Sequence, residues 1–353
     1  MTDGRRVLIT GVAGQLAGQV ARALEERDDV AEIFGVDVHD PSPELQRTEF
    51  VRADVRNPLV GRVLETAKVD TVLHLSTASA PAAAGGRARM KEINVIGAMQ
   101  LLAACQKAPS LRRLVVKSST AIYGSEYTDP GSFREDVSPR TPPKHGFGKD
   151  ASEVEAYVRA FGRRRKDVDV SILRFANLLG PRVDSAFQSL FTLPMVPTVL
   201  GYDPRLQFCH EEDAVAVLER AATQDHPGIF NVAGDGVLYL SQCVRLAGRL
   251  PSPIPLPFVA GVASALRRTR RADIASDQLR FMQFGRVVDT SRLKDVLGYT
   301  PRYSTRETFE DFVRRRRIRG VIQPDEVVRW EREVSTFLQR KAQERFLARG
   351  GAG

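Results

Sequence analysis

The sequence has few cysteines and no long hydrophobic run. Its 353 residues include only Cys105, Cys209 and Cys243, which are too few and too scattered for a disulfide framework or a zinc site. No apolar stretch approaches the ~20 residues that a membrane-spanning helix requires. The first strand-like run begins at Arg6, which leaves no room for a secretory signal before it. We therefore expect a reduced, cytoplasmic protein without a bound metal ion.

The overall composition is typical of a globular protein. Hydrophobic residues make up 42% of the chain and charged residues 27%, which supports a core and excludes collagen, low-complexity sequence and wholesale disorder. The length predicts two domains, or one large α/β domain with an appendage. The 52 basic and 43 acidic residues give a net charge of +9. That charge suits anionic small molecules, nucleic acid or a membrane surface and does not choose among them.

Short apolar runs alternate with helical patterns over the first 175 residues. The strand-like runs are 6–10, 33–37, 49–53, 71–75, 114–118 and 170–174, with a later one at 228–232. The helix-like stretches are the stripe of Leu16, Val20 and Leu24, then 93–105, 151–161 and 213–222. Because most of these strand runs do not alternate with polar residues, they are typical of strands covered on both faces. This order predicts an α/β protein with a Rossmann-type, doubly wound parallel sheet.

The pattern loosens after residue 175 and predicts a division of the chain. Residues 1–175 form the sheet domain, and 176–320 form a smaller lobe over the carboxyl ends of the strands, where ligands bind in such sheets. Within that lobe, 210–235 return to the first domain. Residues 321–353 form an amphipathic helix and tail, whose apolar face includes Val327 and Trp330. This helix either docks on its own domain or binds a partner.

A glycine-rich loop connects the first strand to the first helix. Gly11 and Gly14 permit a tight turn and a close approach to a pyrophosphate, and the helix that follows supplies free N–H groups and a positive dipole. Asp37 ends the second strand, 26 residues after Gly11. Its carboxylate would accept hydrogen bonds from adenosine ribose hydroxyls and repel a 2′-phosphate, which favours NAD over NADP.

The glycine loop and a series of later segments resemble the NAD-dependent epimerase/dehydratase family of extended short-chain dehydrogenases/reductases, which includes UDP-glucose 4-epimerase. The resemblance covers residues 5–310. The loop follows the pattern T-G-x-x-G-x-x-G, with Ala17 at the third glycine. The other matching segments are 53–56, 73–76, 94–97, 118–124, 174–181, 210–213 and 289–299. The resemblance implies an enzyme with bound NAD.

The resemblance implies a role for several of these residues. Asp54 would meet the adenine, Leu75 would lie behind the cofactor, Asn94 would shape the site, and Ser119 would supply a catalytic hydroxyl that also contacts the substrate. On the substrate side the candidates are Asn177 and Arg205. In the family an arginine faces the substrate phosphate; the matching position here is Leu206, and Arg205 stands one residue before it. The resemblance implies a UDP-sugar as the small-molecule substrate. Family members often form homodimers through the helices that correspond to 93–105 and 151–161.

One position departs from the family pattern. The family's acid/base is the tyrosine of Y-x-x-x-K, whereas here His145 stands four residues before Lys149. Imidazole accepts protons near neutral pH but is shorter than a phenol, so a proton would cross a gap, for instance through water. Ser119, His145 and Lys149 are therefore the catalytic candidates, with Lys149 also holding the nicotinamide ribose. Two functions stay open: an oxidoreductase or isomerase acting on a nucleotide sugar or related hydroxylated metabolite by transient hydride transfer, and an NAD-binding sensor or scaffold with little or no turnover.

Three arginine-rich runs stand out, at 163–166, 267–271 and 314–319. The usual meaning of such runs is a solvated face, and without interleaved aromatics they do not predict specific nucleic-acid binding. The second run follows the apolar stretch 254–266. That combination suits either an anionic membrane surface or the core of the smaller lobe, and we favour the core.

Overall fold

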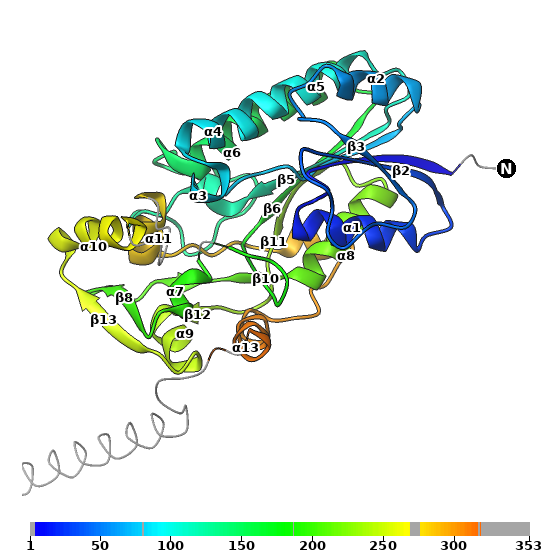
Figure 1. The fold of residues 1–353 in the computed structure, drawn as a ribbon. Coiled ribbons are helices and arrows are strands. Elements are labelled where there is room, and N and C mark those ends of the chain that lie inside the picture. Colours follow the sequence, from blue (N-terminus) through cyan, green and yellow to red (C-terminus); the bar gives the residue numbers. More distant parts are fainter. Residues whose placement is uncertain (1–3, 80, 186, 269–275, 317, 319–353) are drawn as a thin grey trace, which may run out of the picture.

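A seven-stranded, fully parallel sheet forms the centre of the larger domain in a computed structural model of the chain (Figure 1), which describes residues 4–79, 81–185, 187–268, 276–316 and 318. The strand order is β11-β6-β5-β4-β1-β2-β3. The strands are β1 (Arg5–Thr10), β2 (Val30–Asp37), β3 (Thr48–Arg52), β4 (Thr71–His74), β5 (Arg113–Ser119), β6 (Asp169–Phe175) and β11 (Gly228–Val232). The order reverses at β1, and the prediction of a Rossmann-type, doubly wound sheet is confirmed.

Helices cover both faces of the sheet, as Figure 1 shows. On one face lie α1 (Gln15–Glu25) and α8 (Glu211–Thr223), and on the other lie α2 (Leu59–Thr66), α5 (Gly97–Lys107) and α6 (Gly146–Arg164). Successive strand residues point to opposite faces, so Val115 packs into the core on the α1 side while Leu114 and Val116 pack into the core on the α5 side. The remaining short helices of this domain are α3 (Pro81–Ala84), α4 (Arg87–Lys91), the π-helix η1 (Glu92–Ile96) and the 3₁₀-helix η2 (Thr120–Tyr123).

A smaller lobe has its own core at the carboxyl edge of the sheet. Its centre is a cluster of aromatic rings in edge-on or stacked contact, among them Phe191, Phe208 and Phe309. The other elements are β7 (Asn177–Leu179), α7 (Ser189–Thr192), β8 (Met195–Val199), β9 (Arg205–Leu206), β10 (Phe208–His210), β12 (Leu238–Tyr239), α9 (Leu240–Leu246), β13 (Leu250–Ile254), α10 (Leu256–Arg268), α11 (Ser276–Phe284), α12 (Ser291–Asp295) and α13 (Thr305–Arg315).

The proline-punctuated stretch 254–266 ends β13 and forms α10. Ala263 is buried in the core of the smaller lobe, whereas Leu256 and Phe258 are exposed. One face of this stretch therefore belongs to the core, which was the favoured interpretation. The amphipathic helix and tail predicted over 321–353 lie outside the described residues. So do residues 269–271 of the second arginine run and Arg317 and Arg319 of the third. Across the described part of the chain, no helix combines the length and the apolarity needed to cross a membrane.

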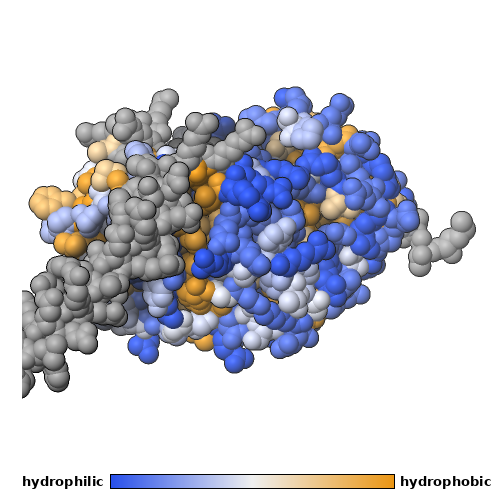
Figure 2. Space-filling view, turned by 90° about the horizontal axis from the view of Figure 1, so that it is seen from below, coloured by the Kyte–Doolittle hydropathy of each residue, from blue (hydrophilic) through white to orange (hydrophobic). Residues whose placement is uncertain are grey.

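The first arginine run divides into exposed and structural residues. Arg163, Arg164 and Lys166 are exposed, whereas the Arg165 guanidinium donates to the carbonyl oxygens of Cys105 at 3.0 Å and Ala108 at 3.1 Å. Arg165 thus joins the ends of α5 and α6. Figure 2 shows that the face seen from below is largely hydrophilic on its right-hand side, where the sheet domain lies in Figure 1. This is the polar outer surface expected of helices that bury one stripe.

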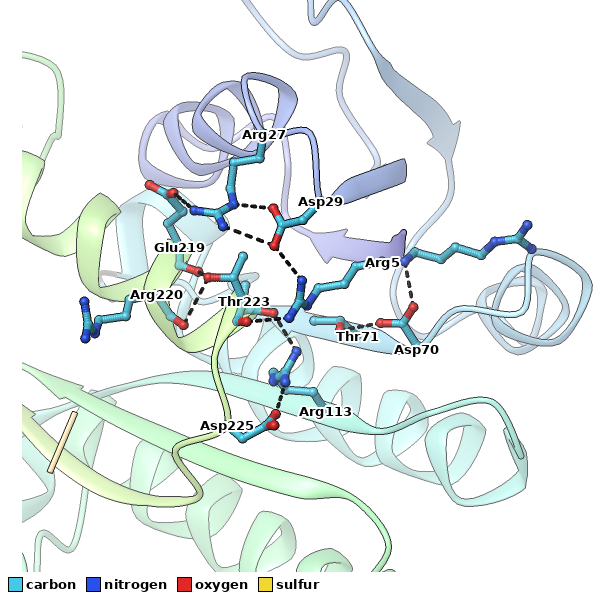
Figure 3. A network of polar contacts seen from close by, with 12 residues as sticks. Arg5, Arg27, Asp29, Asp70, Thr71, Arg113, Glu219, Arg220, Thr223 and Asp225 are labelled. Carbon is cyan, nitrogen blue, oxygen red and sulfur yellow. Dashed lines mark hydrogen bonds and ion pairs between the residues drawn. The ribbon is translucent and has the colours of Figure 1, made fainter. Parts of the chain in front are cut away.

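A polar network ties the amino ends of the strands to α1 and α8 (Figure 3). Asp29 accepts from Arg5 at 2.6 Å and from Arg27 at 2.7 Å, and these guanidinium groups, Arg27 first, lower the pKa of its carboxyl. Arg27 also binds Glu219 of α8 at 2.9 Å, and Arg5 donates to the Thr223 carbonyl at 2.6 Å. The network closes the edge of the sheet opposite to the one that carries the cavity described below.

A buried ion pair fixes α6 on the sheet. Arg174 of β6 donates to Glu155 of α6 at 2.7 and 3.0 Å, and the Ser118 hydroxyl of β5 donates to the same carboxylate at 2.6 Å. Glu155 and Arg174 are almost fully buried, and the pKa of Arg174 is raised because the carboxylate outweighs the effect of burial. Ser118 immediately precedes Ser119, so this pair also supports the catalytic candidate.

We expect Glu155→Ala to destabilise the protein by about 3–5 kcal/mol, because it leaves the buried Arg174 guanidinium without its counter-charge. Glu153→Ala, on the same helix, is the matched control. Its carboxylate is partly exposed and lies 3.7 Å from Lys149 Nζ, so its loss should cost within about 1 kcal/mol. Urea unfolding of both variants measures the difference, and equal losses would contradict a special role for Glu155.

Candidate active site

A cavity of about 690 Å³ opens at the carboxyl edge of the sheet and reaches the smaller lobe. The carboxyl ends of parallel strands share one edge, so the loops that follow β1, β4, β5 and β6 converge there. The predicted site residues among its described lining residues are Gly11, Gly14, Ala17, Asp37, Leu75, Ser119, His145 and Asn177. The cavity therefore gathers predicted residues from six separate segments of the chain.

The glycine loop has the close approaches that its sequence predicts. Gly11 adopts a φ of +75°, and a Cβ there would lie 2.7 Å from Ser76 Cα of the next loop. Gly14 is the N-cap of α1 and provides no side-chain cap; a Cβ there would lie 3.1 Å from the Gly11 carbonyl oxygen. The N–H groups that open α1 are therefore not consumed by a side chain, and Ala17 in the first turn lines the cavity. This arrangement fits a pyrophosphate.

Asp37 lies at the carboxyl end of β2, beside the glycine loop. Its Oδ2 accepts a hydrogen bond of 3.1 Å from the Ala13 N–H, and its Oδ1 accepts one of 3.1 Å from the His39 N–H. A carboxylate has about four lone-pair sites, so each oxygen keeps capacity for a ribose hydroxyl. The carboxylate and the glycine loop together fit the adenosine and pyrophosphate parts of NAD.

Three further cofactor candidates differ in placement. Leu75 lines the cavity, whereas Asp54 and Asn94 are not among its lining residues. Asp54 accepts from the Arg56 guanidinium at 2.6 and 2.9 Å, and this partner lowers the pKa of its carboxyl. Asn94 is buried and exchanges hydrogen bonds of 2.8 and 2.9 Å with the Ala78 backbone. Asn94 thus holds the cavity-lining loop after β4 in place.

The catalytic candidates are not all brought together. Ser119 ends β5 and lines the cavity, with its Oγ accepting a hydrogen bond from the Ala121 N–H at 3.1 Å. His145 lines the cavity as an exposed residue and is the N-cap of α6. Lys149, one turn into that helix, is absent from the described lining. Its Nζ lies 3.7 Å from Glu153 Oε1, and its side chain is 44% exposed. The described lining thus includes Ser119 and His145 and does not include Lys149.

No tyrosine is found among the described residues that line the cavity. Tyr123 is buried, with its hydroxyl donating to Asn231 Oδ1 at 2.9 Å and accepting from Arg174 at 2.7 Å. Burial raises the pKa of Tyr123. Tyr157 lies on α6 and is 40% exposed. Neither phenol is placed to substitute for the missing one, and His145 remains the candidate for proton transfer.

Of the two substrate-binding candidates, only one is among the described residues that line the cavity. Asn177 of β7 lines the cavity, whereas Arg205 lies outside its described lining and donates to the Gly131 carbonyl at 3.0 Å. Arg286 lines the cavity instead. Its guanidinium donates to the Gly124 carbonyl at 2.7 Å and to the Thr120 hydroxyl at 3.2 Å, and it stacks 5.0 Å from the Phe281 ring centre. Arg286 therefore lines this end of the cavity, and Arg205 does not.

Sequence reasoning missed four cationic lining residues: Lys117, Lys144, Arg280 and Arg286. Lys117 had a visible signal, because a lysine inside the apolar run 114–118 is unusual for a strand buried on both faces. Arg286 carries no comparable signal. It reaches the loop after β5 from about 160 residues away in the chain, and only the packing of the smaller lobe brings it there.

Gly11→Ala should weaken NAD binding at least tenfold and lower the melting temperature. The substitution forces a left-handed conformation that costs about 1–2 kcal/mol for an L-residue and places a methyl group against backbone atoms. Gly261→Ala in α10 is the control, because a Cβ there meets nothing within 4 Å and alanine favours helix. Calorimetric titration with NAD tests both variants, and unimpaired binding by Gly11→Ala would contradict the close approach.

The chain matches the model of the NAD dependent epimerase/dehydratase family over residues 7–233. It is 44% identical to the uncharacterized protein Rv0501 of Mycobacterium tuberculosis over 338 residues, which cover 95% of this chain and 90% of that protein. A trifunctional UDP-glucose 4,6-dehydratase/epimerase/reductase of Arabidopsis thaliana is 27% identical over 188 residues, 50% of this chain and 28% of that protein.

Solved structures show the same fold. A UDP-glucose 4-epimerase of Thermotoga maritima with UDP-glucose superposes with a TM-score of 0.67 at 20% identity, covering 88% of this chain and 98% of the other. A UDP-glucuronic acid 4-epimerase of Bacillus cereus with UDP-glucuronic acid and NAD gives 0.67 at 18% identity, covering 88% and 99%. The family is NAD-dependent, which confirms the predicted cofactor. The chain belongs to the NAD-dependent epimerase/dehydratase family.

Proposed function

We propose that the protein is an NAD-dependent epimerase or dehydratase-type oxidoreductase that acts on a nucleotide sugar or a related hydroxylated metabolite through transient hydride transfer. The observation that carries this proposal is the shared cavity, which joins the glycine loop and Asp37 at one end to Ser119 and His145 at the other. The similar epimerases of Thermotoga maritima and Bacillus cereus hold UDP-sugars, and this supports the substrate class.

The chain's own residues would hold NAD along the edge of the sheet. The N–H groups that open α1 would bind the pyrophosphate, and the Asp37 carboxylate would accept from the adenosine ribose hydroxyls. Leu75 would pack behind the dinucleotide. Bound NAD supplies the acceptor and donor of hydride that the chemistry requires.

Ser119 and His145 would manage the substrate hydroxyl. The Ser119 Oγ would hold the oxygen of the reacting carbinol, and an imidazole nitrogen of His145, directly or through a water that it holds, would take and return the proton. Because His145 is exposed at the cavity, it can exchange that proton with solvent.

Arg286 and Asn177 would bind the nucleotide diphosphate part of the substrate. Arg286 is positioned by two hydrogen bonds to the segment after β5 and by its contact with Phe281. A guanidinium fixed in this way is a planar fork that suits phosphate oxygens.

A second candidate function is an NAD-binding sensor or scaffold with little or no turnover. The observation that favours it is the composition of the site, in which a histidine replaces the phenol and Lys149 lies outside the described lining. General acid–base assistance contributes typically 10²–10⁴-fold to a rate. A site that lacks most of this assistance could bind the cofactor and still turn over very slowly.

His145→Ala should lower turnover of a nucleotide sugar by about 10²-fold while NAD affinity stays unchanged, because the imidazole moves the proton and does not hold the cofactor. The assay follows reduction of bound NAD and epimerisation across a panel of UDP-sugars. His226→Ala, at the amino end of β11, is the control. If the wild-type protein binds NAD and turns over no member of the panel, the sensor function is supported instead.

Asp37→Asn should weaken NAD binding about tenfold and reduce the preference for NAD over NADP. Asparagine retains an acceptor for the Ala13 N–H but loses the charge, and hydrogen bonds to charged groups contribute about 1.5–3 kcal/mol. Asp40→Asn is the control, because Asp40 is exposed and pairs with Arg52 on the surface. Titration with both dinucleotides measures the preference, which should not move in the control.

A further inference from the structure

Lys117 is a partly buried cation at the cavity with no assigned role. It lies in β5, and its Nζ donates a hydrogen bond of 2.7 Å to the Thr77 hydroxyl in the loop after β4. Side chains two residues apart in a strand share a face, about 7 Å apart along the chain. Lys117 and Ser119 therefore point to the same side of β5, the side on which Val115 packs toward α1 and α8.

No negative charge compensates this ammonium in the part of the chain that the structure describes. Burial lowers the pKa of Lys117 to about 8. Its titratable neighbour is His74 of β4, whose pKa is lowered to about 4 by burial and, to a lesser extent, by Lys117 itself. His74 is therefore neutral near pH 7. On the neighbouring strand β6, the residue paired with Lys117 is Leu173, which carries no charge. The other titratable residues that line the cavity are Asp37, Glu126, Lys144, His145, Asp184, Arg280 and Arg286.

A buried cation without a counter-charge destabilises the ligand-free protein. Such groups persist where a ligand uses them, which makes them candidates for functional sites. Thr77 leaves two of the three ammonium N–H groups available for a ligand, since a lysine ammonium has three donors.

The strand order decides which part of the cofactor this cation meets. Asp37 ends β2, the glycine loop follows β1, and β4 and β5 come next in the sheet. A dinucleotide held with its adenosine at β2 and its pyrophosphate at α1 continues across β4 toward β5. Its nicotinamide end would therefore come near Lys117 and Ser119.

We propose that Lys117, in place of Lys149, is the cation that acts on the nicotinamide end of the bound cofactor, where it favours the uncharged reduced ring over the positively charged oxidised ring. This proposal rests on the proposed function, because it takes the cavity as the redox site. It also gives the site a means to retain the hydride while the transient ketone is present. Lys149 is unsuited to that role because it lies outside the described lining and faces Glu153.

The test compares the dissociation constants of NADH and NAD⁺ by calorimetric titration of the full-length protein, freed of co-purified nucleotide, from pH 6 to 9.5. Lys117→Met should lower the preference for NADH on the order of 10- to 100-fold at pH 6.5, since a unit charge near the ring is removed. In the wild type, the preference should fall as the pH rises through about 8, where the ammonium loses its proton. Lys117→Arg should keep the preference at high pH, because arginine stays charged.

The controls separate a structural role from an electrostatic one. Lys91→Met, on the exposed helix α4, should leave the preference and its pH dependence unchanged. If Lys149→Met instead shows the loss, or if Lys117→Met retains the wild-type preference, the proposal is overturned. Should Lys117→Met fail to fold, the wild-type pH profile and the Lys117→Arg variant still decide the matter.

These outcomes are independent of turnover, because no sugar nucleotide is present in the titration. A wild type that shows the pH-dependent preference but processes no substrate contradicts the proposed function and leaves the assignment of Lys117 intact. A wild type that processes substrate but shows no such preference contradicts Lys117 alone. Failure to bind either form of the cofactor overturns both.

Discussion

The constraint on which this molecule depends is the parallel direction of its seven strands. Parallel strands place all their carboxyl ends at one edge, where backbone groups are left for loops and ligands. Gly11, Leu75, Ser119 and Asn177 follow or end different strands and meet at that edge for this reason. The opposite edge is closed by a network around Asp29. The cavity is therefore a consequence of topology, and its chemistry depends on which side chains occupy those strand ends.

Two charged groups at β5 and β6 differ in how the loss of solvent around them is compensated. The buried Arg174 has Glu155 as a close partner, and the pair joins α6 to two strands behind Ser119. Within the part of the chain that the structure describes, the partly buried Lys117 has the Thr77 hydroxyl and a neutral histidine beside it and no carboxylate partner. A compensated pair serves to fix the structure, whereas an uncompensated cation gains its partner only when a ligand arrives. The two groups lie on opposite faces of the sheet, so one supports the site and the other faces it.

His145 is the residue proposed for proton transfer, and its position affects how a proton would be handled. His145 is exposed and precedes α6 as its N-cap, so it is not enclosed by the site as a buried acid/base is. Gly148 follows because a Cβ there would lie 2.5 Å from the Ala121 carbonyl oxygen. Glycines near the start of α6 weaken the helical pattern in the sequence, and the sequence therefore predicts this helix only from residue 151. Similarly, the segment predicted as a helix over 93–105 begins with the π-turn of η1, which a 3.6-residue period does not reveal.

The sequence by itself determined the sheet, the order of its apolar strands, the glycine loop and Asp37, because these depend on local periodicity and on conformations that glycine permits. It also placed Ser119, His145 and Asn177 at strand or helix ends, where the cavity forms. Only the tertiary structure decided which cations face that cavity. Lys149 lies 3.7 Å from Glu153 and Arg205 donates to the Gly131 carbonyl, whereas Lys117 and Arg286 are among the described lining residues. The reason is physical: a long cationic side chain goes to whichever partner the fold brings within reach, and that depends on contacts between segments far apart in the chain.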